Sequence, residues 1–342
     1  MFEKDKIAID LGSSNIKIMV GNKKQVKLFE VIKTPKGCIE DDKIVDLEQI
    51  MNLLQIFLKK NNVRTKQIGF VIHGQDVISR HTEVPIIDDK GIKTSLEWEM
   101  NQYLPKDIIE YSIDYEIIEK IDTLEKKSLK LLVSAVPKEK IDQLVKLSQM
   151  LNLEIVAIDI NSNCARRVFK DVSKKHTSLE SIAVINLGSN NTNVIILDKG
   201  KLFIEREIPF GVNNMLKEII KKENIEHDSA FEYLKEKFSF MGNENDNELQ
   251  NRVTSLFNNV LSSLEKIITF FTIGKSKSNL DSIYLIGGGC DINGLCEYVS
   301  NYFNCPVYLL DDVKGIGVKT MISTDCNIKH FIGTLGLLLR RE

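Results

Sequence analysis

The sequence has little of what a secreted, disulfide-bonded or membrane-spanning protein needs. Its six cysteines form no CxxC pair, which favours free thiols in a reducing compartment. No apolar run approaches the roughly 20 residues that span a bilayer, and the first residues, MFEKDK, contain no apolar signal core. The five histidines are scattered without a second ligand at metal spacing, and the net charge of −2 gives no whole-chain attraction to nucleic acid or to an anionic membrane. We therefore expect a cytoplasmic protein with no nucleic-acid partner.

The most informative stretch is the segment 7–20, IAIDLGSSNIKIMV, which predicts a strand, a tight polar turn and a second strand. A similar segment, 183–197, reads AVINLGSNNTNVIIL. Asn186 follows Asp10 by 176 residues (186 − 10), and both turn glycines are in register at that offset. One hairpin with a Gly-Ser turn is common, but two in register predict a duplicated fold. The chain of 342 residues is long enough for two domains.

The two turns have the composition of phosphate-binding loops. Glycine lets the backbone approach a ligand closely, and small polar side chains leave its N–H groups uncovered. A ligand held by both turns would lie in a cleft between two domains. The residues concerned are Gly12, Ser13, Ser14 and Asn15 in the first turn and Gly188, Ser189, Asn190 and Asn191 in the second.

Three further candidates carry weaker signals. Asp10 ends the first strand, next to the first turn. Its carboxylate would repel a phosphate bound there unless a hard cation such as Mg²⁺ lay between them. Taken alone, Asp10 is an ordinary turn residue. Lys17 could reach a phosphate, or it could be a solvated strand lysine. Gly287–Gly289 follows an apolar strand and would let a base or a ribose lie against the backbone, although such glycines also make ordinary strand-to-helix turns.

Hydrophobic periodicity predicts an α/β fold with two similar halves and an α+β insertion at 76–153. Outside the hairpins we expect strands at 25–33, 67–72, 113–118, 129–136, 154–158, 203–208, 282–286 and 307–310. We expect helices at 48–60, 94–102, from Pro137, and at 161–169, 213–222, 229–237, 248–273, 293–301 and 330–339. Polar connections are expected at 172–180 and 242–247.

The three glycine-containing loops, in this order, resemble the phosphate-1, phosphate-2 and adenosine motifs of the actin/Hsp70/sugar-kinase superfamily. Nearly the whole chain more closely resembles the PilM family, actin-like proteins of type IV pilus assembly that are related to the division protein FtsA. The most similar pieces are ISRHTEVP, EWEMNQYLPKDIIEYSIDYEII, LLVSAVPKEKIDQLVKLSQMLNLEIVAIDI, LFIEREIPFGVNNM, IYLIGGGCDINGL and HFIGTLGLLLR. The resemblance implies an actin-like ATPase fold, with two lobes built on duplicated β-β-β-α-β-α cores.

The resemblance also implies that ATP and Mg²⁺ bind between the lobes. Carried over residue by residue, phosphate-1 comprises Asp10, the turn 12–15 and Lys17, with Asp10 as the metal ligand. Phosphate-2 comprises Asn186 and the turn 188–191. The residues implied to surround the ribose and adenine are Gly211, Lys235, Glu236, Gly287, Gly288 and Gly289.

Two residues depart from the superfamily pattern. Asn186 stands where phosphate-2 usually has Asp, and Asn161 stands where a Gln or Glu often positions the attacking water. An amide can hold a water but cannot take its proton at neutral pH. Asn186 also removes a negative charge that would help hold Mg²⁺. We therefore expect nucleotide binding with slow or absent ATP hydrolysis.

The resemblance divides the chain into subdomains 1A (1–75 and 154–180), 1C (76–153), 2A (181–211 and 281–328) and 2B (212–280), with a C-terminal helix (329–342) returning to 1A. PilM proteins bind the cytoplasmic tail of the membrane protein PilN in a groove bordered by 1A and 1C. The implied function is an ATP-binding scaffold of the inner-membrane pilus platform. It would be cytoplasmic and held at the membrane through a PilN-type partner, with other platform and motor proteins as possible partners.

Two alternatives remain open. The first is an active ATPase or kinase of the same superfamily, against which Asn186 and Asn161 count. The second is an FtsA-like, membrane-tethered division protein; such chains carry a linker and an amphipathic helix after the last helix of the fold, whereas this sequence ends at Glu342. The helix expected at 330–339 is apolar around nearly its whole circumference, and an interfacial helix needs a polar face. We therefore expect it to pack into the first lobe without direct membrane insertion.

Overall fold

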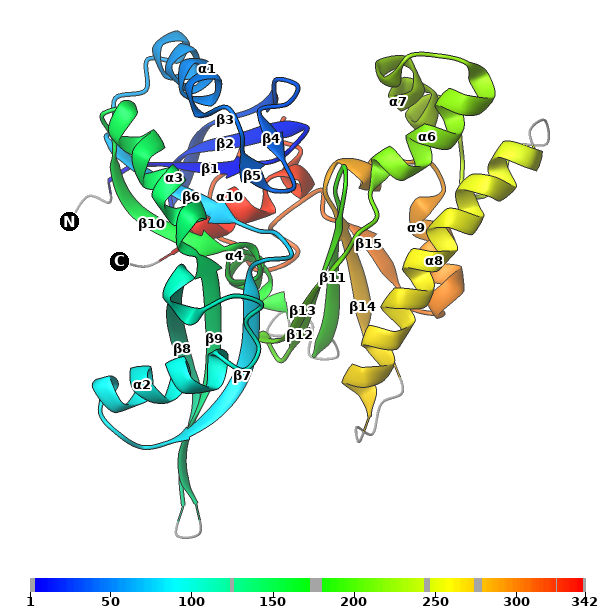
Figure 1. Ribbon diagram of the computed structural model, residues 1–342. Helices are drawn as coiled ribbons and strands as arrows, with labels where there is room; N and C mark the ends of the chain where they lie inside the picture. The colour runs from blue at the N-terminus through cyan, green and yellow to red at the C-terminus, as the bar shows by residue number, and fades with distance from the viewer. Residues whose placement is uncertain are drawn as a thin grey trace. The chain divides into compact units, whose positions relative to one another are not determined.

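The computed structural model describes residues 4–123, 126–172, 180–242, 247–273, 279–323 and 325–340 (Figure 1). Contacts within the chain divide it into two compact units. The N unit comprises the described residues of 4–16 and 32–161, and the C unit comprises the described residues of 17–31 and 162–342. The division therefore does not follow the midpoint of the sequence, because residues 17–31 cluster with the C-terminal part.

A five-stranded sheet in the N-terminal part of the chain has the order β10-β6-β1-β2-β3. Strand β1 (Lys6–Leu11) pairs in parallel with β6 (Gln67–Ile72), which pairs in parallel with β10 (Glu154–Ile160). The hairpin strands are β2 (Asn15–Asn22) and β3 (Gln25–Lys33). Strand β6 is apolar and buried along most of its length, and β1 is buried at its centre, from Ile7 to Ile9, as is usual where a parallel sheet is covered on both faces.

Helix α1 (Leu47–Lys60) follows a short hairpin. The helix begins after Asp46, whose carboxylate accepts the N–H of Gln49 at 2.9 Å and so caps the first turn. Its buried residues, Ile50, Leu54 and Phe57, recur at helical spacing. The hairpin consists of β4 (Ile39–Glu40) and β5 (Lys43–Ile44). Hydrophobic periodicity does not predict it, because two residues per strand are too few to show a period.

The insertion after β6 is a small α+β module. Strands β7 (Ile78–Pro85), β8 (Tyr111–Asp122) and β9 (Lys127–Pro137) form an antiparallel sheet with β9 in the centre. Helix α2 (Asp89–Met100) lies along this sheet (Figure 1). The module has a core of its own, which includes Val84, Ile92, Leu96, Met100, Leu131 and Val133. After β9, helix α3 (Lys138–Met150) leads into β10. The predicted insertion is thus confirmed.

The sheet of the C unit repeats the plan of the first sheet. Its order is β13-β12-β11-β14-β15. Strands β11 (Ser181–Leu187), β12 (Thr192–Asp198) and β13 (Lys201–Ile208) are antiparallel neighbours, and β14 (Ser282–Ile286) and β15 (Val307–Leu309) run parallel to β11. In both sheets, therefore, three consecutive strands form a meander whose first strand pairs in parallel on its other side. The predicted duplication is confirmed.

Several helices of the C unit pack on this sheet, namely α6 (Val212–Glu223), α7 (His227–Glu236), α8 (Asn247–Thr272) and α9 (Leu295–Phe303). They share one core with the sheet, and a fully buried side chain of this type contributes about 1.5–3 kcal/mol. The core includes Val194, Ile196, Met215, Leu216, Leu234, Val253, Val260, Leu264 and Ile283.

The last helix, α10 (Ile332–Leu338), is buried along its whole length. It packs on α4 (Asn161–Phe169), where a Cβ on Gly336 would lie 2.1 Å from the carbonyl oxygen of Cys164. The two helix backbones can approach so closely only because residue 336 is glycine. An edge-to-face ring contact joins the start of this helix to β3, between Phe331 and Phe29. The expected burial of the terminal helix is confirmed.

Most expected elements are present, with their ends shifted by a few residues. Helix α2 starts at Asp89 rather than at 94, because the carboxylate of Asp88 accepts the N–H of Gly91 at 2.9 Å. Helix α10 starts later than expected, because His330 belongs to a preceding 3₁₀ turn, η3 (Ile328–His330). The expected connections at 172–180 and 242–247 lie largely outside the described residues, as do Arg341 and Glu342. The seven-segment subdomain division stays a prediction.

Candidate functional site

The turn between β1 and β2 is closed by its own backbone. The N–H of Gly12 donates to the carbonyl oxygen of Asn15 at 3.2 Å. Thr34 is buried just after β3 and braces the turn: its Oγ1 donates to the oxygen of Gly12 at 2.7 Å, and its N–H donates to the oxygen of Ser14 at 2.9 Å. Three hydrogen bonds thus hold the first candidate phosphate loop in one conformation.

The turn between β11 and β12 is closed in the same way. The N–H of Gly188 donates to the oxygen of Asn191 at 3.0 Å. Two N–H groups at the start of α6 brace this turn. The N–H of Val212 donates to the oxygen of Gly188, and the N–H of Asn213 donates to the oxygen of Ser189. A Cβ on Gly211 would lie 2.4 Å from that Ser189 oxygen, so glycine is required there. The structure therefore places Gly211 directly against the second turn.

Each turn has the same internal hydrogen bond, from Gly12 to Asn15 in the first and from Gly188 to Asn191 in the second. Equivalent residues of the two bonds are 176 positions apart (188 − 12 and 191 − 15). Within the described ranges, the backbone N–H groups of Ser14 and Ser189 donate to no protein atom. An uncommitted N–H in a glycine turn is a donor for an anionic oxygen such as that of phosphate. Each turn thus offers at least one such donor.

Asp10, at the end of β1, is paired with a histidine that the sequence analysis did not select. Oδ1 of Asp10 lies 3.1 Å from Nε2 of His73, and Nδ1 of His73 lies 3.3 Å from Oδ1 of Asp42. Burial by itself lowers the pKa of His73, but the hydrogen bonds and charges of the two carboxylates outweigh burial and raise the pKa to about 10. Burial likewise raises the pKa of Asp42, and the hydrogen bond and charge of His73 outweigh it and lower that pKa. At neutral pH a charged imidazolium therefore lies between two carboxylates.

The glycine loop after β14 contains two glycines that packing requires and one that it does not. Gly287 has φ +88°, and a Cβ there would lie 2.2 Å from Oδ1 of Asn186. A Cβ on Gly289 would lie 2.5 Å from the side chain of Leu187. Gly288 is exposed, and no atom in the described part of the chain lies within 4 Å of its Cβ position. Gly288 is therefore the residue of the three with open space where a flat ligand could lie.

The remaining candidates lie in different places. Lys235 and Glu236 end α7, and the oxygen of Lys235 accepts a hydrogen bond from Nδ2 of Asn293 at 2.8 Å, so this end of α7 lies beside the chain that follows the glycine loop. Lys17 is a partly buried residue of β2. Within the C unit, the second turn, Asn186, Gly211 and the glycine loop are neighbours. Asp10 and the first turn belong to the N unit.

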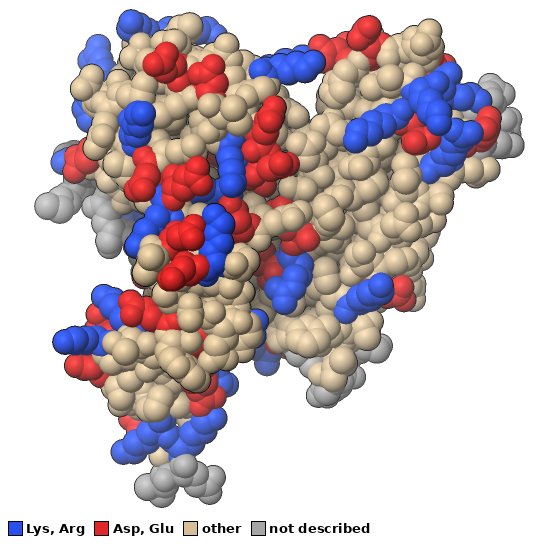
Figure 2. Space-filling view, viewed as in Figure 1, with Lys and Arg blue, Asp and Glu red and all other residues tan. Residues whose placement is uncertain are grey.

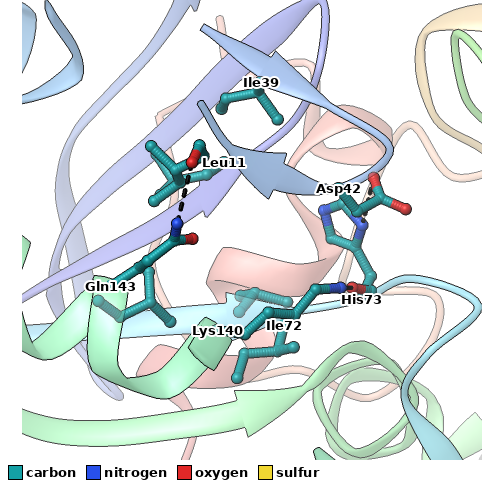
Figure 3. Close-up of a pocket in the computed structure, with 10 residues that line it drawn as sticks. Leu11, Ile39, Asp42, Ile72, His73, Lys140 and Gln143 are labelled. Atoms are coloured by element: carbon teal, nitrogen blue, oxygen red, sulfur yellow. Dashed lines mark hydrogen bonds and ion pairs between the residues drawn. The ribbon is translucent and has the colours of Figure 1, made fainter. Parts of the chain in front are cut away.

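A pocket opens in the N unit beside the hairpin β4–β5 (Figure 3). Its volume is about 400 Å³, including the part that is open to solvent. Nε2 of Gln143 donates to the oxygen of Ile44 at 3.0 Å, and Nζ of the buried Lys140 donates to the oxygen of His73 at 3.0 Å. The wall is mostly apolar and the polar groups are few; the lining residues are Leu11, Ile39, Asp42, Ile44, Val71, Ile72, His73, Lys140, Gln143 and Leu144.

The residues that the sequence analysis missed here are His73, Asp42 and the pocket lining. One signal could have found His73. Strands β1 and β6 pair in parallel with Asp10 opposite Val71, so the residues just after β6 lie at the same sheet edge as Asp10. No comparable signal indicates Asp42, because it is placed by a hairpin of two-residue strands.

Solved structures with similar folds define the class of protein. The ethanolamine utilization protein EutJ from Carboxydothermus hydrogenoformans is 13% identical, with a TM-score of 0.56 over 99% of this chain and 90% of that one. MreB5 of Spiroplasma citri bound to ADP is 13% identical, with a TM-score of 0.53 over 97% and 95%. A PilM–PilN type IV pilus biogenesis complex is 17% identical, with a TM-score of 0.81 over 98% and 97%. The chain therefore has the actin-like ATPase fold.

The sequence profile of one family, described as type IV pilus assembly protein PilM, matches residues 8–342. The chain belongs to this family, and the resemblance drawn from its motifs is confirmed. On the face seen in Figure 2, acidic and basic side chains are mixed on the left of the view, and a wide area without charged side chains lies on the right. Among the helices described, none is long and apolar enough to cross a membrane.

Proposed function

We propose that this chain is a cytoplasmic, nucleotide-binding scaffold of the type IV pilus inner-membrane platform, and that it docks the cytoplasmic tail of a PilN-type membrane protein. The observation that carries this proposal is the likeness to the PilM–PilN complex, with a TM-score of 0.81 over 98% of this chain, within a family of pilus assembly proteins. Through its tail, the partner would hold the scaffold at the inner face of the membrane.

The pocket beside α3 is the tail site that we propose. Its apolar wall suits one aliphatic side chain of an extended peptide, and the polar groups of Asp42, Lys140 and Gln143 suit the peptide backbone and charges around it. The wall combines residues of predicted subdomain 1A, such as Ile44, with residues of predicted subdomain 1C, such as Leu144. This is the border at which the family resemblance puts the tail groove.

ATP is the nucleotide that we propose, with its phosphates on the two glycine turns and its adenosine against Gly288. The uncommitted N–H groups of Ser14 and Ser189 support phosphate binding, and the open position over Gly288 supports a flat ligand. Lys235 and Glu236 would lie towards the ribose. The likeness to MreB5, solved with ADP, agrees with this class of ligand.

We propose Mg²⁺ as the metal ion that accompanies the nucleotide, with Asp10 as its protein ligand. Asp10 supplies a carboxylate, which Mg²⁺ prefers, but its Oδ1 already faces the charged imidazole of His73 at 3.1 Å. Asn186 supplies an uncharged amide. Asp10 would therefore share Mg²⁺ with the phosphates, which bring the negative charge that the protein lacks there. The bound ion would neutralise the phosphate charge.

Hydrolysis of the bound ATP would be slow or absent. The amides of Asn186 and Asn161 can orient a water molecule but cannot accept its proton at neutral pH. The nucleotide would then act as a structural ligand that stabilises one conformation of the scaffold, and tail binding would not require turnover.

Fluorescence anisotropy with a labelled PilN-type tail peptide tests the docking site. Ile44→Glu places a charge on the apolar wall and should weaken binding at least tenfold, which is about 1.4 kcal/mol. Ile56→Glu is the matched control, because Ile56 is 67% exposed on α1, and it should bind like the wild type. No binding by the wild-type chain would contradict the docking function. Equal affinity of the two variants would contradict the pocket assignment.

Thermal unfolding with and without ATP–Mg²⁺ tests the nucleotide site in protein freed of nucleotide. A ligand at 100 times its Kd stabilises the native state by about 2.7 kcal/mol, which raises the melting temperature measurably. Gly288→Leu should abolish the rise without unfolding the protein, because its Cβ position is open. Gly315→Leu, where a Cβ would meet only an oxygen at 3.9 Å, should keep the rise. A rise that persists in Gly288→Leu would contradict the site.

A further inference from the structure

A second cluster of ligand-type side chains lies in the C unit, outside the phosphate turns. Cys290 and Asp291 belong to the 3₁₀ turn η2 (Gly288–Asp291), and His330 ends η3. One atom from each side chain, the thiol sulfur, a carboxylate oxygen and an imidazole nitrogen, lies within 4.8 Å of the other two. We propose that this cluster binds a borderline-soft divalent cation, of which Zn²⁺ is the best fit.

The distances suit a tetrahedral ion. Nε2 of His330 lies 3.1 Å from Oδ2 of Asp291. Zn–N and Zn–O bonds near 2.05 Å at a tetrahedral angle put the two ligand atoms about 3.3 Å apart. A metal ion can therefore replace the proton of this hydrogen bond with a shift of a few tenths of an ångström. The sulfur of Cys290 lies at most 4.8 Å from the His330 nitrogen and from the Asp291 oxygen. In a tetrahedral site these distances would be about 3.6 Å, so the sulfur needs a larger movement.

The thiol of Cys290 donates to the oxygen of Gly287 at 2.8 Å, and binding of a dication would release that proton to solvent. A thiolate and a carboxylate bring two negative charges, which Zn²⁺ neutralises. Nζ of Lys329 donates to Oδ1 of Asp291 at 2.7 Å, which leaves Oδ2 for the ion, and ligating carboxylates are commonly hydrogen-bonded in this way. Lys329 is itself near Asp311 at 3.4 Å. The ammonium of Lys235 lies 3.9 Å from Oδ2, and its side chain is 35% exposed, so it can turn outwards.

The donor types select the class of metal. A sulfur, a nitrogen and an oxygen donor favour Zn²⁺ and Co²⁺ over Mg²⁺ and Ca²⁺, which prefer oxygen alone. Three protein ligands leave a fourth position for water. The ion would tie η2 to η3, two turns whose ligands are 39 residues apart in sequence. Gly288 lies in η2, so the ion would also fix the loop that the proposed function assigns to adenosine, although the metal site itself needs no nucleotide.

Titration of the chelator-treated, nucleotide-free chain with Co²⁺ tests this proposal. We expect one Co²⁺ per chain with a thiolate-to-cobalt charge-transfer band in the near ultraviolet, and displacement by one equivalent of Zn²⁺. Cys290→Ser should remove the band, and His330→Gln should weaken Co²⁺ binding at least tenfold. The controls Cys296→Ser and His227→Gln remove a thiol and an imidazole outside the cluster and should bind like the wild type.

The variants keep the test decisive. Cys290 is buried, so Cys290→Ser could fail to fold, whereas His330 is 21% exposed and its replacement by glutamine is mild. The proposal is overturned if the wild-type chain gives no thiolate band. It is also overturned if His330→Gln binds Co²⁺ as tightly as the wild type. Because no nucleotide or tail peptide is present, neither result bears on the proposed scaffold function.

Discussion

Replacing His73 by glutamine should make stability much less dependent on pH. The pKa of His73 is raised from 6.5 to about 10, so its charged form stabilises the folded chain. That stabilisation is fully present below pH 6.5 and is lost as pH rises through 10. The linkage relation gives roughly 4–5 kcal/mol at pH 6 and roughly 1–2 kcal/mol at pH 9. The difference in unfolding free energy between the wild type and His73→Gln should therefore shrink by about 3 kcal/mol over this range.

Chemical denaturation followed by circular dichroism at pH 6, 7, 8 and 9 measures this difference. The pKa of Asp42 is lowered from its ordinary value, so this range stays above it and Asp42 remains charged throughout. His227→Gln is the control, because His227 lies in α7 outside the cluster and its replacement should leave the pH dependence of the wild type intact. If the curves of the wild type and His73→Gln run parallel from pH 6 to pH 9, the ion-pair reasoning is refuted.

Three other outcomes follow from the same contacts. Asn186→Asp should increase phosphate release from ATP, measured by a coupled phosphate assay. Strong hydrolysis by the unmodified chain, abolished by Asp10→Ala, would instead support the hypothesis of an active ATPase. Gly287→Ala should destabilise the chain by about 2 kcal/mol or more, because φ of Gly287 is +88° and the new Cβ would meet Asn186. In the same denaturation assay, Gly288→Ala should lower stability by less than about 0.5 kcal/mol. Gly336→Ala should lower stability by about 1–3 kcal/mol by forcing α10 away from Cys164, and an unchanged melting temperature would contradict the close packing of α10 on α4.

The two turns could be predicted from sequence because their information is local. Glycine followed by small polar residues, flanked by apolar strands, indicates a tight hairpin, and its recurrence after 176 residues indicates duplication. The structure adds what sequence could not supply, namely that Gly12 and Gly188 make the same hydrogen bond and that Thr34 and the start of α6 brace the two turns. Those bracing groups come from elements distant in sequence.

Neither side-chain cluster could be predicted in full, because each also depends on tertiary contacts. His73 meets Asp10 through the parallel pairing of β1 with β6, and it meets Asp42 through a hairpin too short to show a period. Cys290 and His330 meet only after η2 and η3 pack together. Sequence spacing correctly shows no local metal motif, yet the fold assembles three ligand types.

The glycine loop illustrates a different limit. Three consecutive glycines are typical both of a ligand-binding loop and of a tight turn, so their sequence alone does not distinguish the two. The structure separates them: Gly287 and Gly289 are required by contacts with Asn186 and Leu187, and Gly288 has free space above it. Sequence could not tell which glycine serves packing and which is open to a ligand.

Co-sedimentation with lipid vesicles tests the central claim most directly. The chain should remain in the supernatant with bare anionic vesicles and should pellet with vesicles that display a PilN-type tail. Ile44→Glu should abolish this pelleting, and Ile56→Glu should preserve it. Pelleting with bare vesicles that is lost when residues 331–342 are deleted, in a truncated chain shown to be folded, would contradict the scaffold account and favour an FtsA-like membrane protein.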